Sequence, residues 1–126
     1  MKVAIPHWQG RVSPVFDVAG NVVVIDVDGG HEQTRREFVF GVEGPAARAA
    51  RLAQTGAEVL VCGAISRPLE MALTAAGVEV IPQTCGDVDH VLAALLDGRL
   101  QKGAFLMPGC CGRRRQFRAR FRHGAR

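Results

Sequence analysis

Residues 58 to 81, EVLVCGAISRPLEMALTAAGVEVI, decide the fold of this chain. The nearly all-apolar run 58–62 is typical of a short strand buried on both faces, and residues 78–81 read in the same way. Between them, the stretch from Arg67 to Ala76 has the composition of a helix. Two such strands, joined by a helix through short loops, predict a right-handed parallel unit.

The ends of the helices carry residues that favour capping. Ser66 is a plausible N-cap for the helix that begins at Arg67, and Gly77 stops that helix. Asp87 caps a further helix that ends at Gly98 and carries apolar side chains at helical spacing, namely Val88, Val91, Leu92, Leu95 and Leu96. The second half of the chain therefore reads strand, helix, strand, helix.

The first half reads as three strands followed by a helix. Residues 2–8 predict a short strand, and residues 21–28 and 33–40 predict an antiparallel hairpin around the turn Asp28-Gly29-Gly30. Residues 45–55 predict a helix that begins at a proline, is followed by a glycine, and carries a narrow apolar stripe of Ala46, Ala49, Ala50 and Ala53. The fold class is therefore α/β.

Length and composition restrict the class of protein. A chain of 126 residues and 13.5 kDa fits one compact domain with its own core. With 48% hydrophobic and 22% charged residues, the balance is that of a globular protein, which excludes disorder over most of the length. No apolar run approaches the ~20 residues that cross a bilayer, and no signal-peptide pattern is present. We expect a cytoplasmic protein without membrane contact.

The net charge of +4 comes from the C-terminus. Seven of the 16 Lys and Arg residues lie within residues 113–126, which hold no acid, so the first 112 residues carry nine basic and 12 acidic side chains. Such a tail can contact a nucleic acid, an anionic membrane or an acidic partner, or it can be a solvated terminus. The charge alone does not decide between them.

Sulfur and imidazole side chains follow the predicted parallel strands. Cys62 ends one strand, Cys85 follows the next, and His7 and Trp8 end the first strand of the chain. Because ligands collect at the carboxyl ends of parallel strands, we expect these side chains to lie on one rim. Each cysteine precedes a helix N-terminus, which favours negative charge, and Arg67 adds a positive one. The alternative for a cysteine at a strand end is a small core residue.

Cys110 and Cys111 are adjacent in the stretch Met107-Pro108-Gly109-Cys110-Cys111-Gly112. As soft thiolates they favour Cu(I), zinc or iron–sulfur species, and we consider a flap that closes over a metal centre. A redox pair and a simple connector to the arginine-rich tail are the alternatives.

Five short stretches occur in an order that matches a known family: KVAIP at 2–6, GRVSPVFD at 10–17, CGAISRPL at 62–69, Ala76-Gly77 before a strand, and CGDV at 85–88. They resemble the dinitrogenase iron–molybdenum cofactor biosynthesis family of NifX-like and NifB C-terminal-like proteins. The resemblance extends over residues 1 to about 100.

The resemblance implies a ribonuclease H-like fold over residues 1–103. That fold is a five-stranded mixed sheet with the second strand antiparallel, flanked by about three helices. Residues 104–126 then form a Cys-Cys segment and an arginine-rich tail. The resemblance also implies a small non-enzymatic carrier or scaffold that binds an iron–sulfur or molybdenum–iron–sulfur cluster and exchanges it with donor and acceptor proteins.

One position departs from the family pattern. Many members carry a histidine before the phenylalanine of the loop after the first strand, and it is a favoured cluster ligand, whereas this chain has Val15. Either the cluster role has lapsed or coordination has moved to thiolates. We favour the second, with Cys62, Cys85, Cys110 and Cys111 as metal ligands and with His7, Gly63, Ser66, Arg67 and Gly86 as further contacts to the cofactor.

Other functions have weaker support in the residues. The stretch 3–7, VAIPH, supplies no acid, which disfavours a two-metal nuclease of the ribonuclease H type. A thiol redox enzyme using Cys110 and Cys111 lacks a recognisable base. An interaction module that binds an anionic partner through residues 113–126, where Phe117 and Phe121 lie among the arginines, is the main alternative without metal.

Overall fold

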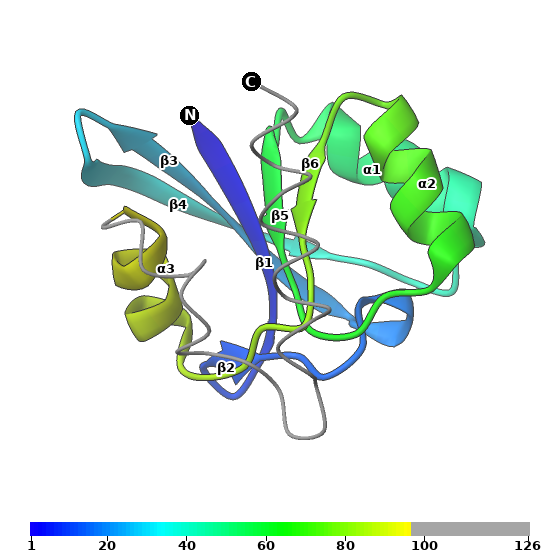
Figure 1. The fold of residues 1–126 in the computed structure, drawn as a ribbon, viewed down its shortest axis with the longest axis horizontal. Helices are drawn as coiled ribbons and strands as arrows, with labels where there is room; N and C mark the ends of the chain where they lie inside the picture. The colour runs from blue at the N-terminus through cyan, green and yellow to red at the C-terminus, as the bar shows by residue number, and fades with distance from the viewer. Residues whose placement is uncertain (97–126) are drawn as a thin grey trace, which may run out of the picture.

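The computed structural model describes residues 1–96. Its sheet contains β1 (Lys2–Trp8), β2 (Arg11–Val12), β3 (Asn21–Asp28), β4 (His31–Val39), β5 (Val59–Val61) and β6 (Glu79–Ile81). The order across the sheet is β4-β3-β1-β5-β6, and β2 pairs with β1 alone (Figure 1). Strands β1, β5 and β6 are parallel, whereas β3 is antiparallel to β1 and β4. The mixed sheet with an antiparallel second long strand is confirmed, and the short β2 is an addition to it.

Three α-helices flank the sheet, as expected: α1 (Pro45–Gln54), α2 (Arg67–Ala75) and α3 (Val88–Leu96), together with a short 3₁₀ helix, η1 (Phe16–Val18). Ser66 is the N-cap of α2, and its side chain accepts a hydrogen bond from the Leu69 N–H. Pro45 begins α1, where its missing N–H costs no helical hydrogen bond. Helices α1 and α2 lie on one side of the sheet and α3 on the other (Figure 1).

Alternation along the strands divides the core into two layers. Ala4 and Leu60 belong to the hydrophobic cluster that includes Leu52 of α1 and Leu73 of α2. On the other face, a second cluster joins sheet and helix residues including Ile5, Val61 and Ile81 with Val91 and Leu92 of α3. Each fully buried Leu or Ile contributes about 1.5–3 kcal/mol, so both layers hold the strands that carry the loops described below.

The buried stripe of α1 differs from the expected alanine stripe. Arg48, Ala49 and Leu52 are the buried residues of this helix, while Ala46 and Ala50 are exposed. The buried face of the helix includes Arg48 because its guanidinium donates hydrogen bonds to three backbone carbonyls. These bonds allow a charged side chain to occupy the interior.

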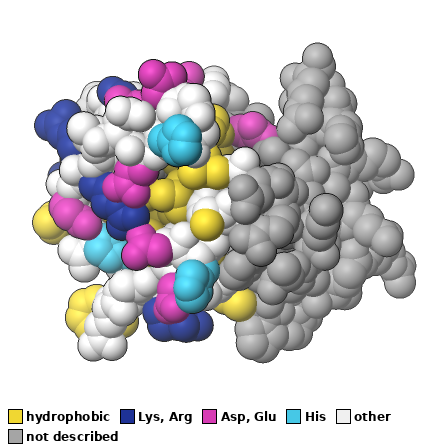
Figure 2. All heavy atoms as spheres, turned by 90° about the vertical axis from the view of Figure 1, so that its left-hand side faces the viewer, with side chains coloured by type: hydrophobic (Ala, Val, Ile, Leu, Met, Phe, Trp, Pro, Cys, Tyr) yellow, Lys and Arg dark blue, Asp and Glu magenta, His cyan; other side chains and the backbone are white. Residues whose placement is uncertain are grey.

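An ion pair joins α3 to the β3–β4 hairpin. Arg35 of β4 forms ion pairs with Glu32 and with Asp89 of α3. Figure 2, which looks at this side of the molecule, shows hydrophobic side chains at the centre of the face with charged and histidine side chains around them. Such exposed pairs contribute about 0–1 kcal/mol each, so the Arg35–Asp89 pair orients α3 more than it stabilises the fold.

Some predictions concern residues beyond the described part. The domain boundary at residues 103 and 104, the Cys110–Cys111 pair and the polyanion contact of residues 113–126 all lie outside residues 1–96 and stay predictions. Within residues 1–96, none of the helices is long and apolar enough to cross a membrane.

Candidate functional site

Three loops meet at the carboxyl ends of the parallel strands. They are residues 9–20 after β1, residues 62–66 after β5, and residues 82–87 after β6, and we call them together the loop rim. Hydrogen bonds join the first loop to both others, so the loops form one continuous surface. This edge is where open α/β sheets bind their ligands.

The first loop is bonded to the second as an added strand would be. The Ala64 N–H donates to the Pro14 carbonyl at 2.7 Å, and the Phe16 N–H donates to the Ala64 carbonyl at 2.9 Å. The Asp17 carboxylate accepts the Ser66 N–H at 2.7 Å. These bonds fix residues 14–17 against the start of α2.

Gly63 is the residue that allows this close approach. A Cβ atom at its position would lie 2.5 Å from the Pro14 carbonyl oxygen and 2.7 Å from that of Ser13. Both atoms belong to the backbone and cannot rotate away. The structure therefore explains this glycine by the packing of the two loops.

The first loop is also bonded to the third. The Val12 N–H donates to the Gly86 carbonyl at 2.9 Å, and Arg11 Nη1 donates to Asp87 Oδ1 at 3.1 Å. Gly86 has a φ of 123°, a conformation that side-chain-bearing residues rarely adopt. The turn before α3 is thus held in place by the loop that follows β1.

A groove of about 360 Å³ lies beside the first loop. We call it the Trp8 groove. Trp8 is 62% exposed and Val18 is 80% exposed, so the groove presents apolar surface to solvent. Val15, at the position where many members of the resembled family carry a histidine, also lines it. The full lining is His7, Trp8, Ser13, Pro14, Val15, Val18, Ala19, Gly20 and Asn21.

His7 lies in the Trp8 groove with its imidazole already hydrogen-bonded. Its Nε2 atom lies 2.8 Å from Glu37 Oε1, a carboxylate of β4. The bond fixes the orientation of the ring through Nε2. Nδ1 is the ring nitrogen that this bond does not use, and we consider it as the atom that would contact a ligand. His7 is the one imidazole among the groove-lining residues.

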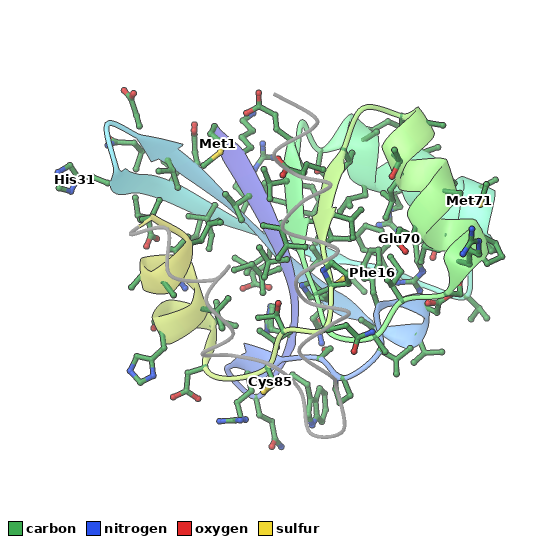
Figure 3. The ribbon with its side chains drawn as sticks, in the orientation of Figure 1. Met1, Phe16, His31, Glu70, Met71 and Cys85 are labelled. Atoms are coloured by element: carbon green, nitrogen blue, oxygen red, sulfur yellow. The ribbon has the colours of Figure 1, made fainter. Side chains whose placement is uncertain are left out.

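The two described cysteines differ in access. Cys62 is fully buried in the hydrophobic cluster on the α1 and α2 side, whereas Cys85 is partly exposed in the loop after β6. Figure 3 shows Cys85 at the end of the molecule where β2 lies. Their backbones are neighbours, since the Thr84 N–H donates to the Cys62 carbonyl at 3.0 Å. Within residues 1–96, no three His, Cys, Asp or Glu side chains gather to hold a metal ion.

The Asp17 carboxylate of the first loop lies at the N-terminus of α2. The Ser66 side chain caps the helix, and the Asp17 carboxylate occupies the Ser66 N–H. The positive end of the helix therefore already has a negative partner from the first loop. Arg67, in the next position, is exposed on the surface.

Two residues that shape this site were not predicted from the sequence. Asp17 links the first loop to α2, and Arg48 is buried beneath η1. The available signal for Arg48 was its spacing, since it lies four residues before the buried Leu52 on the same helix face. Asp17 gave no signal, because its partner is 49 residues away along the chain.

Glu43, whose Oε1 lies 3.7 Å from Arg48 Nη2, provides a pH-dependent prediction. Its Oε2 accepts a hydrogen bond from Arg51 Nη1 at 2.7 Å, and this bond is the main cause that holds the pKa of Glu43 below its usual range. A lowered folded-state pKa stabilises the fold above the ordinary glutamate pKa of about 4.3, and the stabilisation is lost as the pH falls through the folded value. In urea unfolding between pH 7 and pH 3, the stability difference between wild type and Glu43→Gln should therefore shrink at the acid end. A difference that stays constant with pH would contradict this assignment.

The chain matches a known protein family over most of its length. A family model described as "Dinitrogenase iron-molybdenum cofactor" matches residues 1–98. A search of the curated proteins finds no match. Among solved structures, PH0822 is 22% identical with a TM-score of 0.74, over 79% of this chain and 91% of that one.

Two further structures are more similar in sequence. A Thermotoga protein, provisionally named as a NifB protein, is 26% identical with a TM-score of 0.64, over 78% of this chain and 89% of that one. The apo form of the orange protein from Desulfovibrio gigas is 28% identical with a TM-score of 0.66, over 78% of this chain and 88% of that one. The folds agree, and the family model spans all the described residues. The chain belongs to the dinitrogenase iron–molybdenum cofactor family.

Proposed function

We propose that this protein is a non-enzymatic carrier or scaffold that binds an iron–sulfur or molybdenum–iron–sulfur cluster as cargo. In this proposal it receives the cluster from a donor protein and passes it to an acceptor during cofactor assembly. The observation that carries the proposal is the family match over residues 1–98. The joined loop rim, with Cys85 partly exposed on it, supports the proposal from the structure.

The ligand set follows from access to each sulfur. Cys85 is the described thiol that a cluster can reach from solvent, and thiolates are the ligands that iron–sulfur species prefer. Cys62 would have to leave its hydrophobic cluster to reach a metal, so we place it in the core. Cys110 and Cys111 supply the further thiolates in this proposal, because the described residues alone do not gather a metal site.

The loop rim carries apolar surface as well as Cys85, which fits a cargo that is shielded on one side. The Trp8 groove belongs to the same first loop that is bonded to Gly86, so an apolar wall lies on the loop rim. Arg67 and the Gly86 backbone remain proposed contacts to the negative charge of the cluster, and His7 a proposed contact through Nδ1. Gly63 contributes by allowing the first two loops to pack closely, and Ser66 by donating its N–H to Asp17 of the first loop.

Anaerobic reconstitution with iron, sulfide and molybdate tests the proposal. We expect a coloured protein whose metal content falls at least several-fold in Cys85→Ser and in a Cys110→Ser, Cys111→Ser double variant. Cys62→Ala is the matched control and should keep its metal content, with a modest loss of stability from the small cavity. An unchanged spectrum in the variant that lacks all four cysteines would reject cluster binding through thiolates.

A further inference from the structure

We propose that Arg48 is the positioning residue of the Trp8 groove: its buried guanidinium holds η1 so that Val18 and Ala19 form one wall of the groove. The part of the inference that concerns cargo retention rests on the proposed function. The part that concerns the groove wall does not, because it can be measured on the protein without cargo.

Arg48 is almost fully buried, with 2% of its surface exposed. Its Nη1 donates to the Phe16 carbonyl at 3.1 Å and to the Ala19 carbonyl at 2.8 Å, while Nη2 donates to the Gly41 carbonyl at 2.7 Å. One side chain therefore bonds both ends of η1 and the segment after β4. Burial lowers the pKa of the Arg48 guanidinium, and the neighbouring Glu43 carboxylate acts in the opposite direction.

Two aromatic rings complete the surroundings of the cation. The guanidinium carbon lies 5.4 Å from the ring centroid of Phe16 and 5.3 Å from that of Phe40. Figure 3 shows Phe16 on the side of the sheet that faces α1 and α2. Desolvated cation–π contacts of this kind contribute about 2 kcal/mol, which helps to offset the cost of burying the charge.

The geometry requires the fork of an arginine. The Phe16 carbonyl accepts the Ala19 N–H at 3.1 Å within the 3₁₀ turn and has a second lone pair for Arg48. The Ala19 carbonyl lies within reach of the same Arg48 nitrogen. Lysine has one ammonium on a flexible stem, which cannot also span to Gly41 with a planar fork. Arg48 Nε has no hydrogen-bond partner among the described residues, so Nη1 and Nη2 are the atoms that orient the side chain.

The hydrogen bonds of Arg48 to η1 lie directly behind the groove wall. Phe16 of η1 is fully buried, whereas Val18 of the same helix is 80% exposed and lines the groove. Asp17, between them, accepts the Ser66 N–H and joins η1 to the loop rim. A change at Arg48 therefore moves the groove wall and the rim contact together, although Arg48 itself does not line the groove.

Amide hydrogen exchange on the cargo-free protein tests the positioning. In Arg48→Met we expect the amides of residues 16–20 to exchange at least tenfold faster, while amides of β1 and β5 keep their rates. Arg48→Lys should restore part of the protection, and it serves as the second variant if Arg48→Met fails to fold. Arg51→Met is the matched control, because Arg51 lies on the same helix and packs on Phe40 without bonding η1. Faster amide exchange throughout the protein would overturn the inference, and so would unchanged exchange rates at residues 16–20.

Trp8, which lines the same groove, provides a spectroscopic readout. It is the single tryptophan of the chain, so 5-fluorotryptophan labelling gives one ¹⁹F resonance. This resonance should shift or broaden in Arg48→Met and stay unchanged in Arg51→Met. With cluster loaded, Arg48→Met should release it to a chelator several-fold faster than Arg51→Met does, and equal release rates would overturn the retention part. A wild type that takes up no cluster rejects the proposed function instead, while an unaltered ¹⁹F spectrum in Arg48→Met rejects the role of Arg48.

Discussion

Replacing Gly63 with alanine is expected to lower the free energy of unfolding by about 3 kcal/mol, because the new methyl group has no space. Its Cβ would lie 2.5 Å from the Pro14 carbonyl oxygen and 2.7 Å from that of Ser13, and both are backbone atoms. The first loop would have to move away from the start of α2, which would also lengthen the hydrogen bonds of Ala64 to Pro14 and Phe16.

Urea unfolding with a matched glycine control measures this effect. Gly41→Ala is the control, because a Cβ at Gly41 meets no atom within 4 Å and its carbonyl stays available to Arg48. The control should change stability by less than about 1 kcal/mol, in either direction. If the two variants were equally stable, the loops would be mobile enough to separate, and the loop rim would not be a fixed surface.

Most of the fold could be predicted from the sequence, because local signals and long-range packing agree there. The run 58–81 carries its own strand, cap, helix and stop residues, and β5, α2 and β6 form within it. The 21–28 strand and its glycine turn are equally local. Strand β2 and η1 were missed because neither has a pattern of its own: β2 is two residues long, and η1 is held by Arg48 from another element.

The site was harder to predict than the fold, and Cys62 shows why. In a strand buried on both faces, every residue is apolar, so periodicity does not tell which side a terminal cysteine faces. The structure places Cys62 with Leu60 in the cluster beneath α1 and α2, while Val59 and Val61 face α3. Cys85 follows a strand and a turn rather than ending the strand, and it is partly exposed. The loop rim was predictable from the topology of the sheet. Whether a cysteine reaches it depends on which face of the strand its side chain points to, because side chains alternate between the two faces.

Phe16→Ala is expected to cost about 4 kcal/mol of unfolding free energy, a large share of the ~5–15 kcal/mol typical of a domain. Phe16 is fully buried, its ring centroid lies 6.2 Å from that of Phe40, and the Arg48 cation lies over it. Truncation leaves a cavity beside a buried charge that has lost one of its two rings. The loss should therefore exceed that of an aliphatic core truncation of similar volume.

Phe38→Ala is the control for Phe16→Ala, since it also has an arginine, Arg36, over its ring at 5.6 Å but is only partly buried at the edge of the same cluster. Its loss should be about 1 kcal/mol, because solvent already screens the cation and little cavity is left. Chemical denaturation of both variants measures the two losses of unfolding free energy. Amide exchange shows which segments are destabilised. If Phe16→Ala lost no more than Phe38→Ala, the contact between Phe16 and Arg48 would not stabilise the first loop. Its position would then come from the Gly63 contact and from its hydrogen bonds to the other two loops.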